Sequence, residues 1–457
     1  MEALESALIT FGNLAWGPWL LILILGGGLY FLILSRFTPF LYLGHSVNLL
    51  RGKFDDPDAP GDITHLQALS SALAGTIGMG NIAGVAVAIH VGGPGAIFWM
   101  WATAVVGIAT KFFTCSLAVM YRGKDSKGDI QGGPMYVIRE GLGARWKPLA
   151  SFFCIAGIIG CLPLFQTNQL IQTIREVIFI EQGWLHESNS MEFNIVAGIL
   201  LAAIVATVIF GGLHRIAKVA ERLVPSMALL YILTALYVLG TNFEQVPGYL
   251  MLIVTDAFTG LAVAGGAIGT VIATGVRRGA FSNEAGIGTE SMAHGAAKTK
   301  EPIREGLVAM VGPIIDTLLI CTCTALIILI SGVWEGGNSN GVTMTANAFK
   351  QTIPSVGLYI LITCIFFFSV TTIFSYSYYG SKCLGYLIGA ERQHWYNYII
   401  VVMTVFASVV SLDAMIGLVD GAFAMMAIPT TVSTIILAPK VMQAARTYFN
   451  KLDGVVS

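Results

Sequence analysis

Charge is the property that this sequence has least of. Only 11% of its 457 residues are charged, and 25 lysines and arginines nearly balance 26 aspartates and glutamates. A water-soluble domain carries about 25% charged residues, so this chain cannot cover a surface that faces water on all sides. It has no basic stripe either, and no nucleic-acid partner is expected. With 55% hydrophobic residues, it is predicted to be an integral membrane protein that contacts the lipid bilayer.

Patterns that hold metal ions or build active sites are scarce. The seven histidines are scattered and form no His-x-x-x-His pair. The seven cysteines lie in apolar stretches without the paired spacing of a zinc site, and we expect them to be buried packing residues. A membrane-embedded enzyme is therefore not expected.

Long apolar stretches, in contrast, are abundant. About 20 residues at ~1.5 Å per residue cross a hydrocarbon core of ~30 Å, so each such stretch is a candidate transmembrane helix. The predicted fold class is an all-α polytopic membrane protein with eleven transmembrane helices. The eleven candidates are residues 15–36, 66–91, 95–121, 149–178, 194–211, 217–240, 258–277, 304–332, 356–387, 396–411 and 415–439.

Basic residues indicate how these helices are oriented. Lysines and arginines gather after every odd-numbered stretch, whereas the opposite loops carry only Arg175 and Lys350. Because cytoplasmic loops are enriched in Lys and Arg, the N-terminus is predicted outside the cell and the C-terminus in the cytoplasm. This orientation assigns Arg277 and Arg278 to a cytoplasmic loop.

Two loops between these helices are rich in glycine and only moderately polar, residues 128–148 and residues 277–299. Both are predicted to be packed elements on the cytoplasmic side rather than flexible linkers. The second should form an amphipathic helix after a turn and lie along the membrane face.

Two of the predicted helices contain several glycines near their middle. The second contains GTIGMGN (Gly75–Asn81), and the seventh contains AVAGGAIGTVIATG (Ala262–Gly275). Each interior glycine costs a helix roughly 1 kcal/mol relative to alanine. Close packing through glycines spaced by four is the alternative explanation, but the glycines around the first motif point around more than half of the helix. Both helices are therefore predicted to be interrupted.

An interrupted helix inside a membrane points to transport. Unpaired backbone groups at that depth are tolerated only beside protein or a water-filled cavity. The free N–H groups at the start of one half-helix can bind a carboxylate, and exposed carbonyl groups can ligate a sodium ion (Na+). Two interrupted helices five positions apart also suggest the halves of an inverted repeat.

Three longer motifs carry a resemblance to a known family. They are GTIGMGNIAGVAVAIHVGGPGAIFWMWATAVVG (75–107), GGPMYVI (132–138) and RRGAFSNEAGIGTESMAHGAAKT (277–299). In this order they resemble the alanine/glycine:cation symporter family, the sodium–alanine symporters of bacteria and archaea. The resemblance implies a LeuT-type fold of the amino acid–polyamine–cation superfamily, with two inverted five-helix repeats.

The resemblance also implies how the chain is divided. An extra transmembrane helix would precede the ten core helices. The implied units are residues 1–62 (extra helix and loop), 63–253 (first repeat), 254–440 (second repeat) and 441–457 (cytoplasmic tail).

By this resemblance the protein would be a multi-pass protein of the cell membrane that imports alanine and glycine with Na+ by alternating access. The substrate carboxylate would meet the backbone near the first interruption, and the ammonium group would meet carbonyl oxygens of the second. Gln166 or Gln169 would also face the substrate, unless they only join helices. The implied substrate-binding residues are Thr76, Gly78, Met79, Gly80, Phe165, Gln166, Gln169, Ala264, Gly265, Gly266, Ala267, Ile268 and Thr270. Met79 departs from the threonine expected in many relatives and could reshape the pocket.

Na+ needs hard oxygen ligands. The resemblance implies a five-oxygen site made by the hydroxyl groups of Thr371 and Thr372 and the carbonyl groups of Ala74, Ile77 and Phe368. The alternative for two adjacent threonines in a helix is bonding back to their own helix carbonyls. A second sodium site is not expected, because Gly265 offers no hydroxyl group. Beyond Na+ no cofactor is expected, and the sequence does not indicate an oligomeric state.

Charged residues inside the apolar stretches leave a second function open. Asp316 or His90 could serve a proton-coupled or exchange-type amino acid carrier of the same fold. Lys111 lies near the end of the third stretch and is expected to extend toward the membrane surface. Asp420 is expected to be structural or to line a gate.

Overall fold

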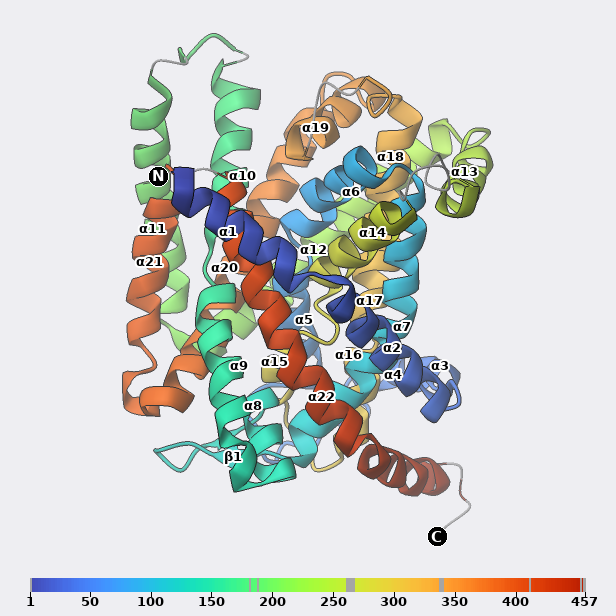
Figure 1. Cartoon of the computed structure of the whole chain (residues 1–457), viewed down its shortest axis with the longest axis vertical. Helices are drawn as coiled ribbons and strands as arrows, with labels where there is room; N and C mark the ends of the chain where they lie inside the picture. The colour runs from blue at the N-terminus through green and yellow to red at the C-terminus, as the bar shows by residue number, and fades with distance from the viewer. Residues whose placement is uncertain are drawn as a thin grey trace.

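The computed structural model describes residues 2–180, 182–186, 189–259, 268–336, 341–410, 412–452 and 454. Nearly all regular structure in this part of the chain is helical, and the helices pack side by side in one bundle (Figure 1). The elements up to residue 180 are α1 (Glu2–Ala15), α2 (Pro18–Leu34), α3 (Thr38–Leu41), α4 (Leu43–Leu50), α5 (His65–Thr76), η1 (Gly80–Gly84), α6 (Val85–Gly92), α7 (Gly95–Met120), β1 (Gly123–Lys124), β2 (Ile130–Gln131), α8 (Pro134–Tyr136), η2 (Val137–Leu142), η3 (Ala144–Trp146), α9 (Lys147–Gly160), α10 (Leu164–Ile174) and η4 (Arg175–Ile180).

The later elements complete the bundle and bring the C-terminal helix back against α1. They are α11 (Ser190–Ile209), α12 (Gly212–Thr241), α13 (Val246–Thr259), α14 (Ile268–Asn283), α15 (Thr289–His294), α16 (Pro302–Ala309), α17 (Val311–Pro313), η7 (Ile314–Cys321), α18 (Thr322–Ser331), α19 (Gly341–Thr352), α20 (Gly357–Ile388), η8 (Ala390–Arg392), α21 (Trp395–Ala407) and α22 (Leu412–Leu452).

Several helices are long and apolar enough to cross a membrane. Among the described residues there are eight, or nine if the bent pair of α5 with η1 and α6 is one span. Large apolar side chains on the outside of the bundle remain exposed, including Ile22 (71%), Leu200 (61%) and Val402 (65%). An exposed apolar surface of this extent fits contact with lipid. The structure therefore supports a multi-pass membrane protein, while the count of eleven helices stays a prediction.

The first predicted interruption is confirmed. A reciprocal cap of Thr64 and Gln67 starts α5, which ends at Thr76. The chain then bends by 52° before the helix resumes at Gly80. This bend lies inside the Gly75–Asn81 motif.

The second predicted interruption can be tested only in part. Residues 262–267 lie outside the described residues, but residues 268–275 belong to the continuous helix α14. The chain leaves α14 after Asn283 and re-enters a helix at Thr289. Between them, Glu284 (φ 55°), Gly286 (φ 86°) and Gly288 (φ 98°) adopt left-handed backbone conformations.

The segment 277–299 is not a surface helix along the membrane face. It contains the end of α14, the interruption and α15, and nearly all of its residues are buried. The other Gly-rich segment, 128–148, forms the end of the β1–β2 hairpin, in which Gly123 pairs with Gln131, and then the short elements α8, η2 and η3. The glycines and other small residues of 277–299 let this segment pack closely against its neighbours. Most of its charged residues are buried with it, so they do not indicate exposure to water.

The four half-helices pair across the bundle. Helix α6 packs against α14, and helix α5 packs against α15 (Figure 1). We call α6 and α14 the outer halves and α5 and α15 the inner halves, names that refer only to the two ends of the bundle. The two interruptions therefore lie at neighbouring positions in the interior. As predicted, all seven cysteines are free and buried.

Candidate functional site

The first interruption presents the start of a half-helix to the interior. The amide of Gly78 donates to Asn81 Oδ1 (2.9 Å), so this N–H group is already paired. Met79 is fully buried at the cap position of the resumed helix, and among the described residues no side chain caps that start. The amides of Met79 and Gly80 are thus better placed than that of Gly78 to meet a carboxylate.

The second interruption lies directly beside the first. A methyl group added to Gly80 would lie 3.5 Å from Phe281 Cδ1 and from Ser282 Cα, at the end of α14. Six residues of the seventh predicted helix are expected to contact the substrate at the second interruption. Ala264, Gly265, Gly266 and Ala267 lie outside the described residues, as does the side chain of Ile268, and Thr270 is exposed on α14 rather than central.

A buried carboxylate joins the two interruptions. Asp316 Oδ1 accepts a hydrogen bond from Asn81 Nδ2 (2.6 Å), and Oδ2 accepts from Ser282 Oγ (2.8 Å) and Thr317 Oγ1 (2.6 Å). Asp316 is completely buried, so these bonds replace its hydration. Through Asn81 the carboxylate also fixes the amide of Gly78. No second sodium site is expected from the sequence, because Gly265 offers no hydroxyl group. Ser282 does supply a hydroxyl group beside the second interruption.

Lys111 does not extend to the membrane surface. Its side chain is buried in the interior of α7, 2% exposed. A methyl group added to Gly312 would lie 3.4 Å from Lys111 Nζ, which places the ammonium group beside α17. The expectation of a surface position is wrong because α16 and α17 cover this face of α7.

Of the two predicted sodium ligands on α20, Thr372 faces the end of α5, whereas the hydroxyl group of Thr371 lies 3.8 Å from Met227 Sδ on α12. A methyl group added to Gly78 would lie 2.6 Å from Thr372 Oγ1. Thr371 Oγ1 donates to Phe367 O (2.8 Å) and Thr372 Oγ1 donates to Phe368 O (2.9 Å), the back-bonded arrangement of helix threonines. Each hydroxyl oxygen keeps lone pairs for a further partner.

The residues whose carbonyl groups are predicted to ligate the same ion are also buried in this region. Ala74 lies in the last turn of α5, Ile77 is the residue that follows this helix, and Phe368 lies one turn before Thr372. Ser375, which the sequence did not single out, donates to Ser71 O (2.9 Å) and joins α20 to α5. Neutral carbonyl and hydroxyl oxygens of this kind suit a hard monovalent cation.

Aromatic rings cover the interruptions on the side of α6 and α14. Phe165, predicted to enclose the substrate, packs edge-on against Phe281 (ring centroids 5.8 Å apart), and Phe281 packs against Phe423 at 5.5 Å. The Arg278 guanidinium lies 5.4 Å from the Phe281 ring centroid. Above this layer, Arg277 Nη2 (2.7 Å) and Arg278 Nη2 (2.6 Å) both donate to Asp420 Oδ2.

Arg277 and Arg278 are therefore not residues of a basic loop. They belong to α14, and Arg278 is almost fully buried in an ion pair. The sequence missed this pairing because Asp420 is about 140 positions away.

The two glutamine candidates differ in their surroundings. Gln169 Nε2 donates to Gln172 Oε1 (3.0 Å), so it takes part in a polar row along α10. Gln166 is equally buried, and its Oε1 atom has no hydrogen-bond partner among the described residues. An unpaired buried oxygen is costly, which makes Gln166 the better candidate for a substrate contact.

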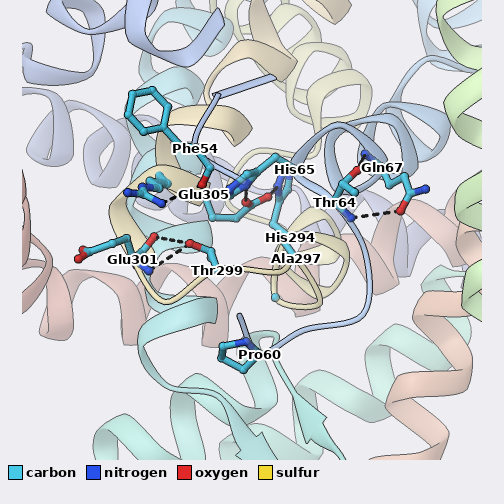
Figure 2. Close-up of polar contacts among 12 residues, drawn as sticks. Phe54, Pro60, Thr64, His65, Gln67, His294, Ala297, Thr299, Glu301 and Glu305 are labelled. Carbon is cyan, nitrogen blue, oxygen red and sulfur yellow. Dashed lines mark hydrogen bonds and ion pairs between the residues drawn. The ribbon is translucent and has the colours of Figure 1, made fainter. Parts of the chain in front are cut away.

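The opposite end of the interruptions is closed by a buried cluster of one glutamate and two histidines (Figure 2). Glu305 of α16 contacts His65 Nδ1, at the start of α5, through Oε2 and His294 Nδ1, at the end of α15, through Oε1 (2.6 Å). The carboxylate is completely buried. Glu305 thus ties the inner halves of both interrupted helices to α16. The sequence offered no signal for it, because His65 and Glu305 are 240 positions apart.

Arg122, which follows α7, adds a second tie between the same segments. The inner ends also pair through a parallel bridge of Ile63 with Ala297. Burial lowers the pKa of the Arg122 guanidinium, although arginine still keeps its charge. The guanidinium donates to the carbonyl oxygens of Gly295 (2.8 Å), Pro60 (3.0 Å), Thr299 (3.1 Å) and Ala297.

Comparison with solved structures defines the class of protein. The fold is similar to that of MhsT, crystallised in complex with L-phenylalanine, with a TM-score of 0.56 and 12% sequence identity over 84% of this chain and 99% of that one. MhsT has the LeuT fold. The chain therefore has a LeuT-type fold of packed helices.

Sequence comparison then gives the family. The model of the sodium:alanine symporter family matches residues 1–455. The sodium/alanine symporter AgcS of Methanococcus maripaludis is 37% identical over 451 residues, covering 97% of each chain. The amino-acid carrier protein AlsT of Bacillus subtilis is 34% identical over 412 residues, covering 89% of this chain and 84% of that one. The chain belongs to the sodium:alanine symporter family, as its motifs predicted, and amino acid symport is the activity that the family and relatives support.

Proposed function

We propose that this protein imports alanine and glycine into the cell together with Na+. The observation that carries the proposal is the meeting of three groups at one place: the uncapped half-helix at Met79 and Gly80, the interruption after Asn283, and the hydroxyl group of Thr372. The half-helix would hold the substrate carboxylate, and the end of α5 with α20 would hold Na+. Met79, Phe165 and Phe281 are buried in this region, and we propose that they leave room only for a small side chain.

We further propose that the end of the bundle with β1 and α8 faces the cytoplasm (Figure 1). Lys124, Lys127 and Lys300 are exposed near this end. The positive-inside rule assigns such lysines to the cytoplasmic side. The rule loses Arg277 and Arg278 as support, because both are paired with Asp420. The N-terminus would then lie outside and the C-terminus inside.

A proton-coupled or exchange-type carrier is the alternative, and Asp316 is the observation that favours it. This carboxylate lies fully buried between the two interruptions and could take up a proton there. His90 is a weaker candidate because it is exposed at the end of α6.

Uptake into proteoliposomes separates these functions. We expect radiolabelled alanine and glycine to accumulate when an inward sodium gradient is the only driving force. A proton gradient in sodium-free buffer should give no accumulation. Accumulation driven by the proton gradient alone would reject sodium coupling in favour of the alternative.

Gly78→Ala should reduce sodium-driven alanine uptake by at least about tenfold. The added methyl group would lie 2.6 Å from Thr372 Oγ1, which forces α5 and α20 apart where the ion is proposed to bind. Gly84→Ala is the matched control in the same interrupted helix, since among the described residues no atom beyond its chain neighbours and its own helix backbone lies within 4 Å of a methyl group there. Equal uptake by the two variants would show that the contact of Gly78 with Thr372 does not matter for transport.

A further inference from the structure

The first helix of the chain, α1, crosses the N-terminal part of α22 at very close range (Figure 1). Glycines permit this approach. A methyl group added to Gly12 would lie 2.8 Å from Gly417 O, and one added to Gly421 would overlap the Phe11 ring. Gly417 and Gly421 are four positions apart on α22, the spacing by which small residues let two membrane helices pack backbone against backbone.

The same short stretch of α22 carries Asp420, the acceptor for both arginines of α14. Trp16, which directly follows α1 and is 5% exposed, donates from Nε1 to the backbone oxygen of Asp420 (2.7 Å). Asn13 Oδ1 accepts a hydrogen bond from Arg277 Nη1 (3.1 Å). The α1 segment therefore contacts both sides of the ion pair, through the backbone of Asp420 and through the side chain of Arg277.

This ion pair lies on one side of the two interruptions. Asp420 is 2% exposed and joins α22 to α14 only six to seven positions before the second interruption begins. Arg278 also covers Phe281, the ring that lies between the ion pair and Gly80. Opening this side requires α14 and α22 to separate at a buried pair of charges, and such pairs depend strongly on the geometry of their partners.

We propose that α1 with Trp16 acts as a brace for the closed state on this side of the transporter. By fixing the backbone of α22 at Asp420 and the side chain of Arg277, it favours the paired arrangement over the separated one. It touches neither the proposed substrate nor the proposed ion. The inference rests on the proposed function in one respect. The proposed transport function and orientation make this side of the protein the extracellular one.

The brace can be tested by the accessibility of a cysteine beneath the ion pair. Phe423 is fully buried in the aromatic layer, one turn of α22 beyond Asp420. In full-length protein carrying Phe423→Cys, the labelling rate with a membrane-impermeant maleimide is measured in proteoliposomes, with the reagent applied to each side in turn. Protein without this substitution gives the blank for the native buried cysteines.

Gly421→Leu, which displaces α1, should raise the labelling rate by about tenfold or more, since the open state is then more populated. Asn13→Ala removes one hydrogen bond without a steric change and should raise it about fivefold. Leu14→Ala is the control, because this α1 side chain is 69% exposed. If Gly421→Leu fails to fold, Asn13→Ala alone decides.

An unchanged labelling rate in the folded α1 variants would overturn the brace. A rise from either side supports it, and the side of reaction reports the orientation separately. Labelling does not require transport, so a protein that fails to take up alanine would contradict the proposed function and leave this result standing. Because unfolding also exposes the introduced cysteine, labelling is compared only among variants whose folded fraction, measured by size-exclusion chromatography, equals that of Phe423→Cys alone. In those variants, a shift toward the outward-open state lowers the maximal uptake rate without raising the half-saturating alanine concentration.

Discussion

Replacing Thr371 and Thr372 together by valine should reduce sodium-stimulated alanine uptake by at least about tenfold, the effect of roughly 1.4 kcal/mol of lost ion binding. Both side chains are buried, and Thr372 lies within contact distance of the Gly78 position at the end of α5. Valine keeps the branched shape but removes the oxygen. Na+ would then lose two of its five proposed ligands.

Thr363→Val is the matched control for this change. Thr363 lies on the same helix and also bonds back to its own helix, donating to Tyr359 O (2.8 Å), but it is exposed. Its uptake should equal that of the unchanged protein. The sodium concentration for half-maximal uptake should rise in Thr371→Val and in Thr372→Val alone. Sodium-stimulated uptake at the original level in the double variant would reject α20 as part of the ion site.

Glu305→Ala should destabilise the protein by about 3–5 kcal/mol, the usual cost of removing one partner from a buried ionic contact. The substitution leaves Nδ1 of both His65 and His294 without an acceptor in the closed inner end of the bundle (Figure 2). It also frees α5 and α15 from α16. Thermal unfolding in detergent, followed by tryptophan fluorescence, measures the loss.

Glu140→Ala provides the comparison for a glutamate at the surface. Glu140 pairs with Arg139 at 2.6 Å, but its side chain is 41% exposed. Such pairs contribute about 0–1 kcal/mol, so the unfolding temperature should hardly move. A similar small shift for Glu305→Ala would mean that the cluster does not hold the inner ends together.

The first interruption could be predicted from sequence because its signal is local. Four glycines and an asparagine within ten residues of an apolar stretch conflict with a helix whatever surrounds them. The second interruption lacks such an isolated signal. Its residues, Asn283 to Gly288, include a charged glutamate and follow two arginines, so hydropathy assigns them to a loop, while the glycines of 262–275 lie partly in a regular helix.

The partners of the charged residues depend on the fold. Asp316 could be singled out as a carboxylate inside an apolar stretch, but its bonds to Asn81 and Ser282 join elements that the sequence does not place together. The roles of Glu305 and Asp420 depend on partners that the fold brings close. Asp420 binds Arg277 and Arg278, which lie more than 140 positions away. Glu305 binds His294, which lies on another helix. Local patterns thus identify where a membrane helix carries an unusual residue, and packing decides what that residue does.

The central claim is that Na+ and a small amino acid share one site between the two interruptions, and equilibrium binding to the purified protein tests it most directly. Alanine affinity is measured at increasing sodium concentration with potassium replacing sodium to keep the ionic strength constant. The account predicts that sodium strengthens alanine binding at least about tenfold, that alanine strengthens sodium binding by the same factor, and that Thr371→Val with Thr372→Val removes both effects. Alanine binding of equal strength in sodium and in potassium would contradict it.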